Sequence, residues 1–261
     1  AGAAAAKFDA ASAAAAVEAP QAQAAPCIAA AASADLAKKG KGGAASAAQA
    51  SPSKLKVLAL HGHAQSASRF KGKIAAVTKE VKSLAEFEFI DGPFPVDECE
   101  HSEENGLGAA FTWIDTSKAG ELGGGRCTKY AGVETVFDEI LGRQFDGVIA
   151  FSMGACVLAS LLCHPEHGPT LRSRIRFAAF FSGFIPKDPL LRSWIEECSA
   201  SGPLTGLPTF HSMGLSDEII VPARSEELAE KFENAVLYRH EGGHVVPAAM
   251  RKDFKAFLAK V

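Results

Sequence analysis

Long apolar segments are missing from this chain of 261 residues. No stretch approaches the roughly 18 consecutive apolar residues that a membrane-spanning helix requires, so the sequence predicts no membrane span. An excess of positive charge is missing too, because 27 Lys and Arg residues face 30 Asp and Glu residues and leave a net charge of −3. Binding to nucleic acid or to an anionic membrane surface depends on a positive field, so neither partner is expected.

Paired cysteines and glycine-rich nucleotide motifs are also missing. The six cysteines are Cys27, Cys99, Cys127, Cys156, Cys163 and Cys198. They form no CxxC pair and no regular framework, which favours an intracellular protein. Cys156 and Cys163 lie on one expected helix, where small buried core residues are the simpler interpretation and a redox or nucleophilic role is the alternative. No strand–turn–helix segment resembles a dinucleotide or P-loop site, so no cofactor is expected.

Aromatic residues are almost absent from the first 50 residues, where Phe8 is the only one and 26 residues are Ala. Alanine buries too little area to offset the entropy of ordering a chain, so residues 1–53 are expected to form a low-complexity arm or linker. A targeting segment is the alternative, because transit peptides are rich in Ala and Ser. Against it, no Arg precedes Arg69 and three acidic residues are present. We therefore expect a cytoplasmic protein, or a plastid or other organellar one if the arm is a targeting segment.

From Lys54 onward, short apolar runs alternate with segments of helical periodicity. Strands are expected over 54–62, 87–93, 145–152, 176–184, 207–214 and 235–243, and helices over 66–84, 133–143, 153–165, 225–233 and 247–261. This alternation predicts an α/β domain at 54–261, with a mainly parallel sheet that carries helices on both faces. Residues 97–130 are expected to be irregular.

Ser152 stands directly between an apolar strand and a helix, in the segment GVIAFSMGA. A serine on such a sharp turn raises its hydroxyl above the sheet, and small residues two positions before and after it let the backbone pack closely. Here these are Ala150 and Gly154. The sequence therefore predicts Ser152 as a nucleophile, with helix N-capping as the simpler alternative.

A nucleophilic serine needs a base and a carboxylate that orients the base. His244 follows the last expected strand in RHEGGHVVP, and Asp217 follows the preceding strand in SMGLSDEIIVP. The chain order Ser152, Asp217, His244 is the order used by α/β-hydrolases. Glu218, next to Asp217, is the alternative carboxylate.

An acyl-transfer site also needs backbone donors for the oxyanion. The N–H of Met153, directly after the serine, is one candidate. The loop LALHGHAQS supplies the other, because Gly62 permits a tight bend that aims the N–H of His63 or Ala64 into the site, and we favour His63.

The two histidines of this loop, His61 and His63, raise the question of a metal site. No Asp–His pair follows them directly, and His164 and His167 come after a helix rather than on a facing loop. We therefore expect no metal.

Six segments, in chain order, resemble the FSH family of serine hydrolases, which belongs to the α/β-hydrolase superfamily: LALHGHAQS, FIDGPFPVD, FDGVIAFSMGA, FFSGFIP, PTFHSMGLSDEIIVP and HEGGHVVP. The resemblance covers about residues 54–261. It implies an α/β-hydrolase fold with little or no lid, cleavage of carboxylic esters or thioesters, and a triad of Ser152, Asp217 and His244. The family usually has GFSQGA where this chain has AFSMGA. Met153 keeps the backbone N–H but removes a side-chain hydrogen-bonding group.

Residues 97–130 occupy the position where such domains build the acyl pocket. Phe111, Trp113 and Ile114 are the apolar candidates, with Tyr130 beyond them, and ordinary core packing is the alternative. Because these residues are apolar and no Arg cluster is apparent, the expected substrates are esters of aliphatic acyl chains. A thioesterase acting on carrier- or CoA-linked acyl groups, with a possible acyl-carrier partner, is one alternative. A non-catalytic hydrolase fold that binds a small molecule is another.

Overall fold

A computed structural model describes residues 53–96, 109–115 and 130–261 of the chain. The chain divides into two units, Ala1–Ala50 and Ser51–Val261, and the first lies outside the described residues. The proposed low-complexity arm at 1–53 therefore stays a prediction. The second unit carries all the elements described below.

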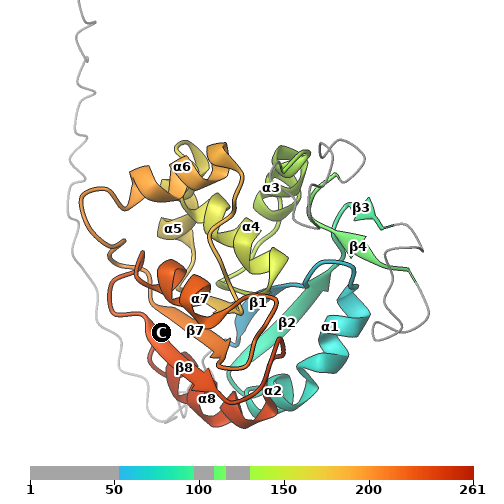
Figure 1. Cartoon of the computed structure of the whole chain (residues 1–261). Helices are drawn as coiled ribbons and strands as arrows, with labels where there is room; N and C mark the ends of the chain where they lie inside the picture. The colour runs from blue at the N-terminus through green and yellow to red at the C-terminus, as the bar shows by residue number, and fades with distance from the viewer. Residues whose placement is uncertain (1–52, 97–108, 116–129) are drawn as a thin grey trace, which may run out of the picture. The chain divides into compact units, whose positions relative to one another are not determined.

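Six parallel strands form the central sheet of the second unit (Figure 1). Their order is β2-β1-β5-β6-β7-β8, with bounds β1 Leu55–Leu60, β2 Ala85–Ile90, β5 Gly147–Phe151, β6 Phe177–Phe181, β7 Thr209–Gly214 and β8 Val236–His240. All five neighbouring pairs of this sheet run parallel. The α/β prediction is confirmed, and all six carboxyl ends lie along one edge.

Helices cover both faces of this sheet, because successive strand residues point to opposite sides. Leu58 and Leu60 belong to one buried cluster, whereas Val57 and Ala59 belong to the other. The first face carries α3 Val133–Leu141, α4 Met153–Leu162, α5 His167–Arg174, α6 Pro189–Cys198 and α7 Pro222–Ala229. The second carries α1 Ala67–Lys73, α2 Ala75–Glu80 and α8 Arg251–Leu258, the last preceded by the 3₁₀ turn η4 Ala248–Met250.

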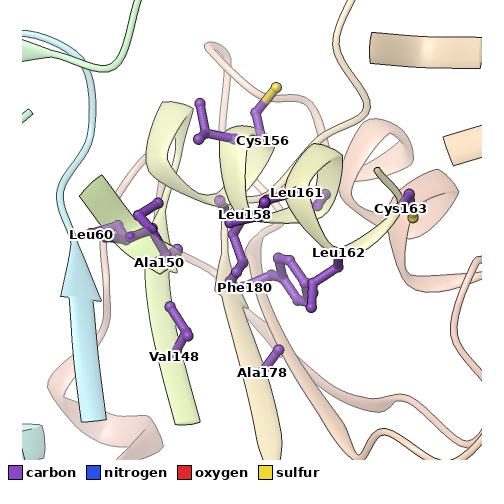
Figure 2. Packing of buried hydrophobic residues seen from close by; sticks show 14 of the residues in the cluster. Leu60, Val148, Ala150, Cys156, Leu158, Leu161, Leu162, Cys163, Ala178 and Phe180 are labelled. Atoms are coloured by element: carbon purple, nitrogen blue, oxygen red, sulfur yellow. The ribbon is translucent and has the colours of Figure 1, made fainter. Parts of the chain in front are cut away.

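Helix α4 lies against the middle of the sheet, with every residue after Met153 buried. Figure 2 shows Leu158 and Leu162 of α4 above the side chains of β5 and β6, including Ala150 and Phe180. Its composition, Ala, Cys, Val and Leu without a charge, suits a helix enclosed on all sides. Its first residue follows Ser152, so the packing of α4 also fixes the position of that serine.

Some elements differ from the sequence prediction. The helix expected over 66–84 is broken at Ile74, whose φ of −103° and ψ of 15° separate α1 from α2 while Val77 stays buried against the sheet. Helices α5 and α6 were not predicted. The start of α6 does carry a signal, since Asp188 caps it with two side-chain hydrogen bonds and Pro189 follows.

A second, two-stranded sheet has one strand just before residues 97–130, the segment expected to be irregular, and one strand within it. It pairs β3 Phe94–Pro95 with β4 Phe111–Thr112 in antiparallel fashion. Strands of two residues leave too short a pattern for sequence reasoning to detect.

Candidate active site

Three polar side chains meet at the carboxyl edge of the sheet. Ser152 follows β5, Asp217 follows β7, and His244 follows β8. Neighbouring parallel strands end at the same edge, so residues far apart in the chain come together there.

Ser152 has the strained backbone expected of a strand-to-helix turn. Its φ of 52° and ψ of −115° lie in a region that costs an L-residue about 1–3 kcal/mol. The N–H of Ser152 donates to the carbonyl of Phe181 at 2.9 Å, which ties the turn to β6. A Cβ on Gly154 would come within 2.5 Å of the carbonyl oxygen of His61, so the turn requires glycine at this position.

His244 links Ser152 to Asp217. Its Nδ1 lies 2.7 Å from Asp217 Oδ2, and its Nε2 lies 2.9 Å from Ser152 Oγ. Because a carboxylate can only accept, Nδ1 carries the proton and Nε2 is left to accept from the serine hydroxyl. This is the arrangement that a general base for Ser152 requires.

Asp217, rather than Glu218, makes this contact. The Asp217 residue is 3 % exposed, and its Oδ1 accepts the backbone N–H groups of Ile219 and Ile220 at 3.0 and 2.8 Å. These bonds orient the carboxylate toward the imidazole. Glu218 is exposed and lies on the wall of the neighbouring pocket.

The two residues expected to supply the oxyanion donors lie at the same pocket as Ser152. Met153 begins α4, and His63 lines the same pocket as Ser152 and Met153. Ala64, the next residue of the loop, has a φ of 51°, which marks a sharp bend after β1. This bend and the start of α4 bring both backbone segments to the pocket that Ser152 lines.

Thr112 of β4 connects these two segments and was not found by sequence reasoning. Its Oγ1 donates to Met153 Sδ at 3.2 Å and lies 3.0 Å from His63 Nδ1. A hydroxyl has one hydrogen, so His63 Nδ1 is the donor in the second contact. Thr112 is fully buried, and it holds the loop and the helix start together.

Both ring nitrogens of His61 form hydrogen bonds with backbone groups. Its Nδ1 donates to the carbonyl of Gly62 at 2.6 Å, and its Nε2 accepts from the N–H of Gly92 at 2.9 Å. Burial lowers its pKa to about 4, which keeps the ring neutral. Both ring nitrogens are occupied, so His61 has none to offer a metal ion.

A pocket of about 300 Å³ opens beside Ser152. It is lined by His63, Tyr130, Ser152, Met153, Phe184, Lys187, Glu218, Ile219, Ile220 and Arg224. A second hollow of about 220 Å³ lies beside His244. Ser152 thus lines one hollow and His244 lines the other.

The residues expected to form this pocket lie elsewhere, apart from Tyr130. Trp113 and Ile114 are 0 % and 1 % exposed in the main hydrophobic cluster. The indole N–H of Trp113 donates to the carbonyl of His61 at 2.7 Å, which satisfies its polar group inside the core. Phe111 is half-buried in β4. For Trp113 and Ile114 the core-packing alternative describes the structure.

The pocket also contains cations that the sequence did not predict. Arg224 lies over the ring of Phe184 at 4.4 Å, and its guanidinium donates to the carbonyl of Ile185 at 3.4 Å. Lys187 lines the same wall. The sequence interpretation, which saw no Arg cluster, did not identify these two groups. Lys187 lies in the loop between β6 and α6, and Arg224 lies in the first turn of α7.

These cations are not neutralised by helix α7. Its glutamates pair with other arginines, Glu226 with Arg239 and Glu227 with Arg192. Within 53–96, 109–115 and 130–261, no carboxylate forms an ion pair with Arg224. Its charge is therefore available to a ligand.

The family model for serine hydrolase (FSH1) matches residues 50–255 of this chain. The chain belongs to this family. The resemblance read from the sequence is thereby confirmed, and the chain is an enzyme of the serine hydrolase type. The FSH1 match covers the whole sheet and all three residues of the Ser152–His244–Asp217 arrangement.

Two curated relatives of this FSH1-family chain that are named esterases illustrate the similarity. It is 34% identical over 206 residues to esterase C25G4.2 of Caenorhabditis elegans, covering 75% of this chain and 87% of the relative. It is 32% identical over 226 residues to esterase OVCA2 of Bos taurus, covering 78% of this chain and 95% of the relative.

Solved structures similar to this FSH1-family chain are α/β-hydrolases. SOBER1 of Arabidopsis thaliana gives a TM-score of 0.51 at 18% identity, covering 80% of this chain and 99% of that one. Acyl-protein thioesterase 2 of Zea mays gives a TM-score of 0.51 at 17% sequence identity, and the match covers 78% of this chain and 94% of that one. The α/β-hydrolase fold expected from the sequence is confirmed.

The described part of the chain contains no helix long and apolar enough to cross a membrane.

Proposed function

We propose that the chain hydrolyses carboxylic esters of aliphatic acyl chains through Ser152, His244 and Asp217. The observation that carries this proposal is the hydrogen-bonded series from Ser152 Oγ through the imidazole of His244 to the carboxylate of Asp217. His244 takes the serine proton as Oγ attacks the acyl carbon, and then donates it to the leaving alkoxide. Water, activated by His244, releases the acyl group from Ser152.

The backbone N–H groups of Met153 and His63 bind the oxyanion formed in each half-reaction. Loss of one such donor costs about 3–4 kcal/mol in transition-state stabilisation. The fixed turn at Ser152 and the Thr112 link support this role, because a donor stabilises the oxyanion only when its direction is set in advance.

The size and lining of the pocket support small to medium acyl chains. Met153, Phe184 and the two isoleucines Ile219 and Ile220 give it an apolar wall. A site of about 300 Å³ is at the small end of the usual range for ligand pockets.

A thioesterase acting on CoA- or carrier-linked acyl groups is the second candidate. Arg224 and Lys187 favour it, because the phosphopantetheine of such substrates is anionic. An acyl-carrier protein would then be the partner. The same triad performs both reactions, so the two candidates differ only in the leaving group.

The experiment that tests the proposal is labelling with a fluorophosphonate probe, which modifies activated serines. We expect the probe to label the wild type, which should also hydrolyse p-nitrophenyl esters. Ser152→Ala should lose both the labelling and the hydrolysis, with unchanged thermal stability. Ser182→Ala is a matched control, since Ser182 is another buried serine with positive φ at the end of a neighbouring strand. A wild type without labelling or turnover would favour the non-catalytic binding fold. A chain-length series of p-nitrophenyl esters beside acyl-CoA thioesters then separates the two enzyme candidates.

A cytoplasmic location is part of the proposal. It is supported by the free thiols of Cys156, Cys163 and Cys198 in the described residues. Fluorescent fusions with and without residues 1–53 test it, and a plastid signal that depends on these residues would overturn it.

A further inference from the structure

Two cysteines form a cluster far from Ser152. Cys163 caps the carboxyl end of α4 and Cys198 is the last residue of α6. Ser152 caps the opposite end of α4, about 16 Å away at the rise of an α-helix. Figure 2 shows Cys163 at this end of α4, beyond Leu162. The proposed hydrolase mechanism does not use either thiol.

Cys163 and Cys198 line the same surface hollow. Arg172 of α5 donates from Nη1 to Cys198 Sγ at 3.4 Å, and the same nitrogen donates to the carbonyl of Leu162. No described carboxylate forms an ion pair with Arg172. Its positive charge is therefore directed at the sulfur of Cys198.

This arrangement makes the two thiols chemically different. The hydrogen bond from Cys163, together with the charge and hydrogen bond of Arg172, lowers the pKa of Cys198 below the ordinary thiol value despite partial burial. The same contact and burial raise the pKa of Cys163. A thiolate at Cys198 thus faces a protonated thiol at Cys163.

A surface hollow of about 210 Å³ gives small molecules access to this pair. It is lined by Cys163, His164, Pro165, Pro169, Arg172, Trp194, Glu197 and Cys198. Cys198 is partly exposed, whereas Cys163 is only 3 % exposed. An incoming oxidant would therefore reach Cys198 first.

We propose that Cys198 and Cys163 form a peroxide-sensitive dithiol site, in which Cys198 reacts first and Cys163 resolves the product into a disulfide. The Cys198 thiolate attacks one oxygen of hydrogen peroxide, the O–O bond breaks, and the sulfenic acid and hydroxide form. The sulfur of Cys163, losing its proton to that hydroxide, attacks the sulfenic sulfur. The S–S bond forms, the S–O bond breaks, and the departing hydroxide takes up the proton that Cys198 released on ionising. Two thiols are oxidised and one peroxide is reduced to two waters.

The disulfide would join the end of α4 to the end of α6. It requires the sulfur atoms to approach to about 2 Å, and both cysteines line one hollow. They lie at the ends of helices α4 and α6, which pack against each other in the first-face cluster.

Cys156 provides the matched control within the same helix. It is fully buried, its Sγ donates to the hydroxyl of Tyr130 at 3.8 Å, and burial raises its pKa to about 12. A buried thiol with such a high pKa is protonated at neutral pH and does not react with peroxide. Cys156 and Cys198 should therefore differ strongly in reactivity.

The test uses the full-length chain with the cysteines outside the described residues replaced: Cys27→Ser, Cys99→Ser and Cys127→Ser. The protein is treated with hydrogen peroxide, digested and mapped by mass spectrometry, with and without a thiol reductant. We expect a Cys163–Cys198 linked peptide that disappears on reduction, while Cys156 stays free. The further variant Cys163→Ser should instead accumulate a Cys198 sulfenic acid that dimedone traps.

Two further variants decide the assignment. Cys198→Ser should abolish peroxide consumption, and Arg172→Gln should slow it about tenfold or more, because the thiolate fraction of Cys198 falls. Cys156→Ser should leave the linked peptide unchanged. A disulfide involving Cys156, or equal reactivity of the three thiols in the folded protein, would overturn the proposal.

Discussion

The imidazole of His244 and the hydroxyl of Ser152, 92 positions apart in the chain, lie 2.9 Å apart. The contact exists because β5 and β8 end at the same edge of a parallel sheet, and because the ring of Phe151 packs against His244 at 4.8 Å between centroids. The buried carboxylate of Asp217 fixes the other side of the imidazole.

Asp217→Asn should reduce kcat for a p-nitrophenyl ester by about 10⁴-fold. An amide can donate its N–H to Nδ1 of His244, which would place the imidazole proton on Nε2 and remove the acceptor for Ser152. The matched control is Glu218→Gln, which changes the adjacent exposed carboxylate and should alter kcat by only a few-fold. If Glu218→Gln caused the larger loss, the assignment of Asp217 as the orienting carboxylate would be wrong.

The positions of these three residues were predictable because each depends on a local pattern. Ser152 stands where a strand meets a helix without a loop, and Asp217 and His244 follow expected strands in the order that α/β-hydrolases use. The parallel sheet was predictable for the same reason, since its alternating elements are visible in the sequence.

The lining of the pocket was not predictable, because it depends on loop packing. Lys187 lies in the loop between β6 and α6 and Arg224 lies in the first turn of α7, and no sequence pattern predicts that the guanidinium of Arg224 packs on the ring of Phe184. Trp113 shows the converse case. Its apolar side chain within 97–130 suggested a substrate wall, but its indole N–H donates to the carbonyl of His61 inside the core.

Gly154→Ala should destabilise the protein by about 1–3 kcal/mol and also lower kcat. The new Cβ would lie 2.5 Å from the carbonyl oxygen of His61, so the start of α4 must shift and carry the N–H of Met153 with it. Chemical denaturation and steady-state kinetics measure the two effects.

Gly72→Ala is the control, because a Cβ there meets nothing within 4 Å. It should stabilise the protein by about 0.5–1 kcal/mol through the lower entropy of the unfolded chain. A kcat unchanged in Gly154→Ala would contradict the role of this close approach in positioning the oxyanion donor.

Acid should destabilise the protein through two buried neutral histidines. Burial lowers the pKa of His61 to about 4 and that of His211 to about 3, from 6.5 in the unfolded chain. As the pH falls below 6.5, both histidines bind protons in the unfolded state but stay neutral in the folded state. The free energy of unfolding therefore decreases until the pH reaches the pKa of each histidine in the folded protein. Each histidine accounts for about 2 kcal/mol between pH 7 and pH 5.

His211→Leu isolates one of these contributions. His211 stacks on Phe180 at 4.8 Å, and its buried Nε2 meets no hydrogen-bond partner among the described residues, so an apolar side chain of similar size fits. Guanidinium unfolding at both pH values should show that the variant loses about 2 kcal/mol less than the wild type on acidification. An identical loss in both proteins would mean that His211 does not titrate on unfolding.

Arg224→Gln should lower kcat/KM for an acyl-CoA thioester about tenfold or more. It should lower kcat/KM for a p-nitrophenyl ester of the same acyl chain much less. A charge-assisted hydrogen bond to phosphate contributes about 1.5–3 kcal/mol, and each 1.4 kcal/mol is a factor of ten. Only the CoA substrate offers an anion to Arg224, so the ratio of the two losses measures binding of the leaving group.

Arg239→Gln is the control for net charge, because Arg239 is an exposed arginine that pairs with Glu226 of α7. This substitution should leave kcat/KM nearly unchanged for both substrates. Equal losses for both substrates in Arg224→Gln would assign Arg224 a different role. It would then hold the loop through its hydrogen bond to the carbonyl of Ile185 instead of binding an anion. The ester with an uncharged leaving group would in that case remain the better model of the substrate.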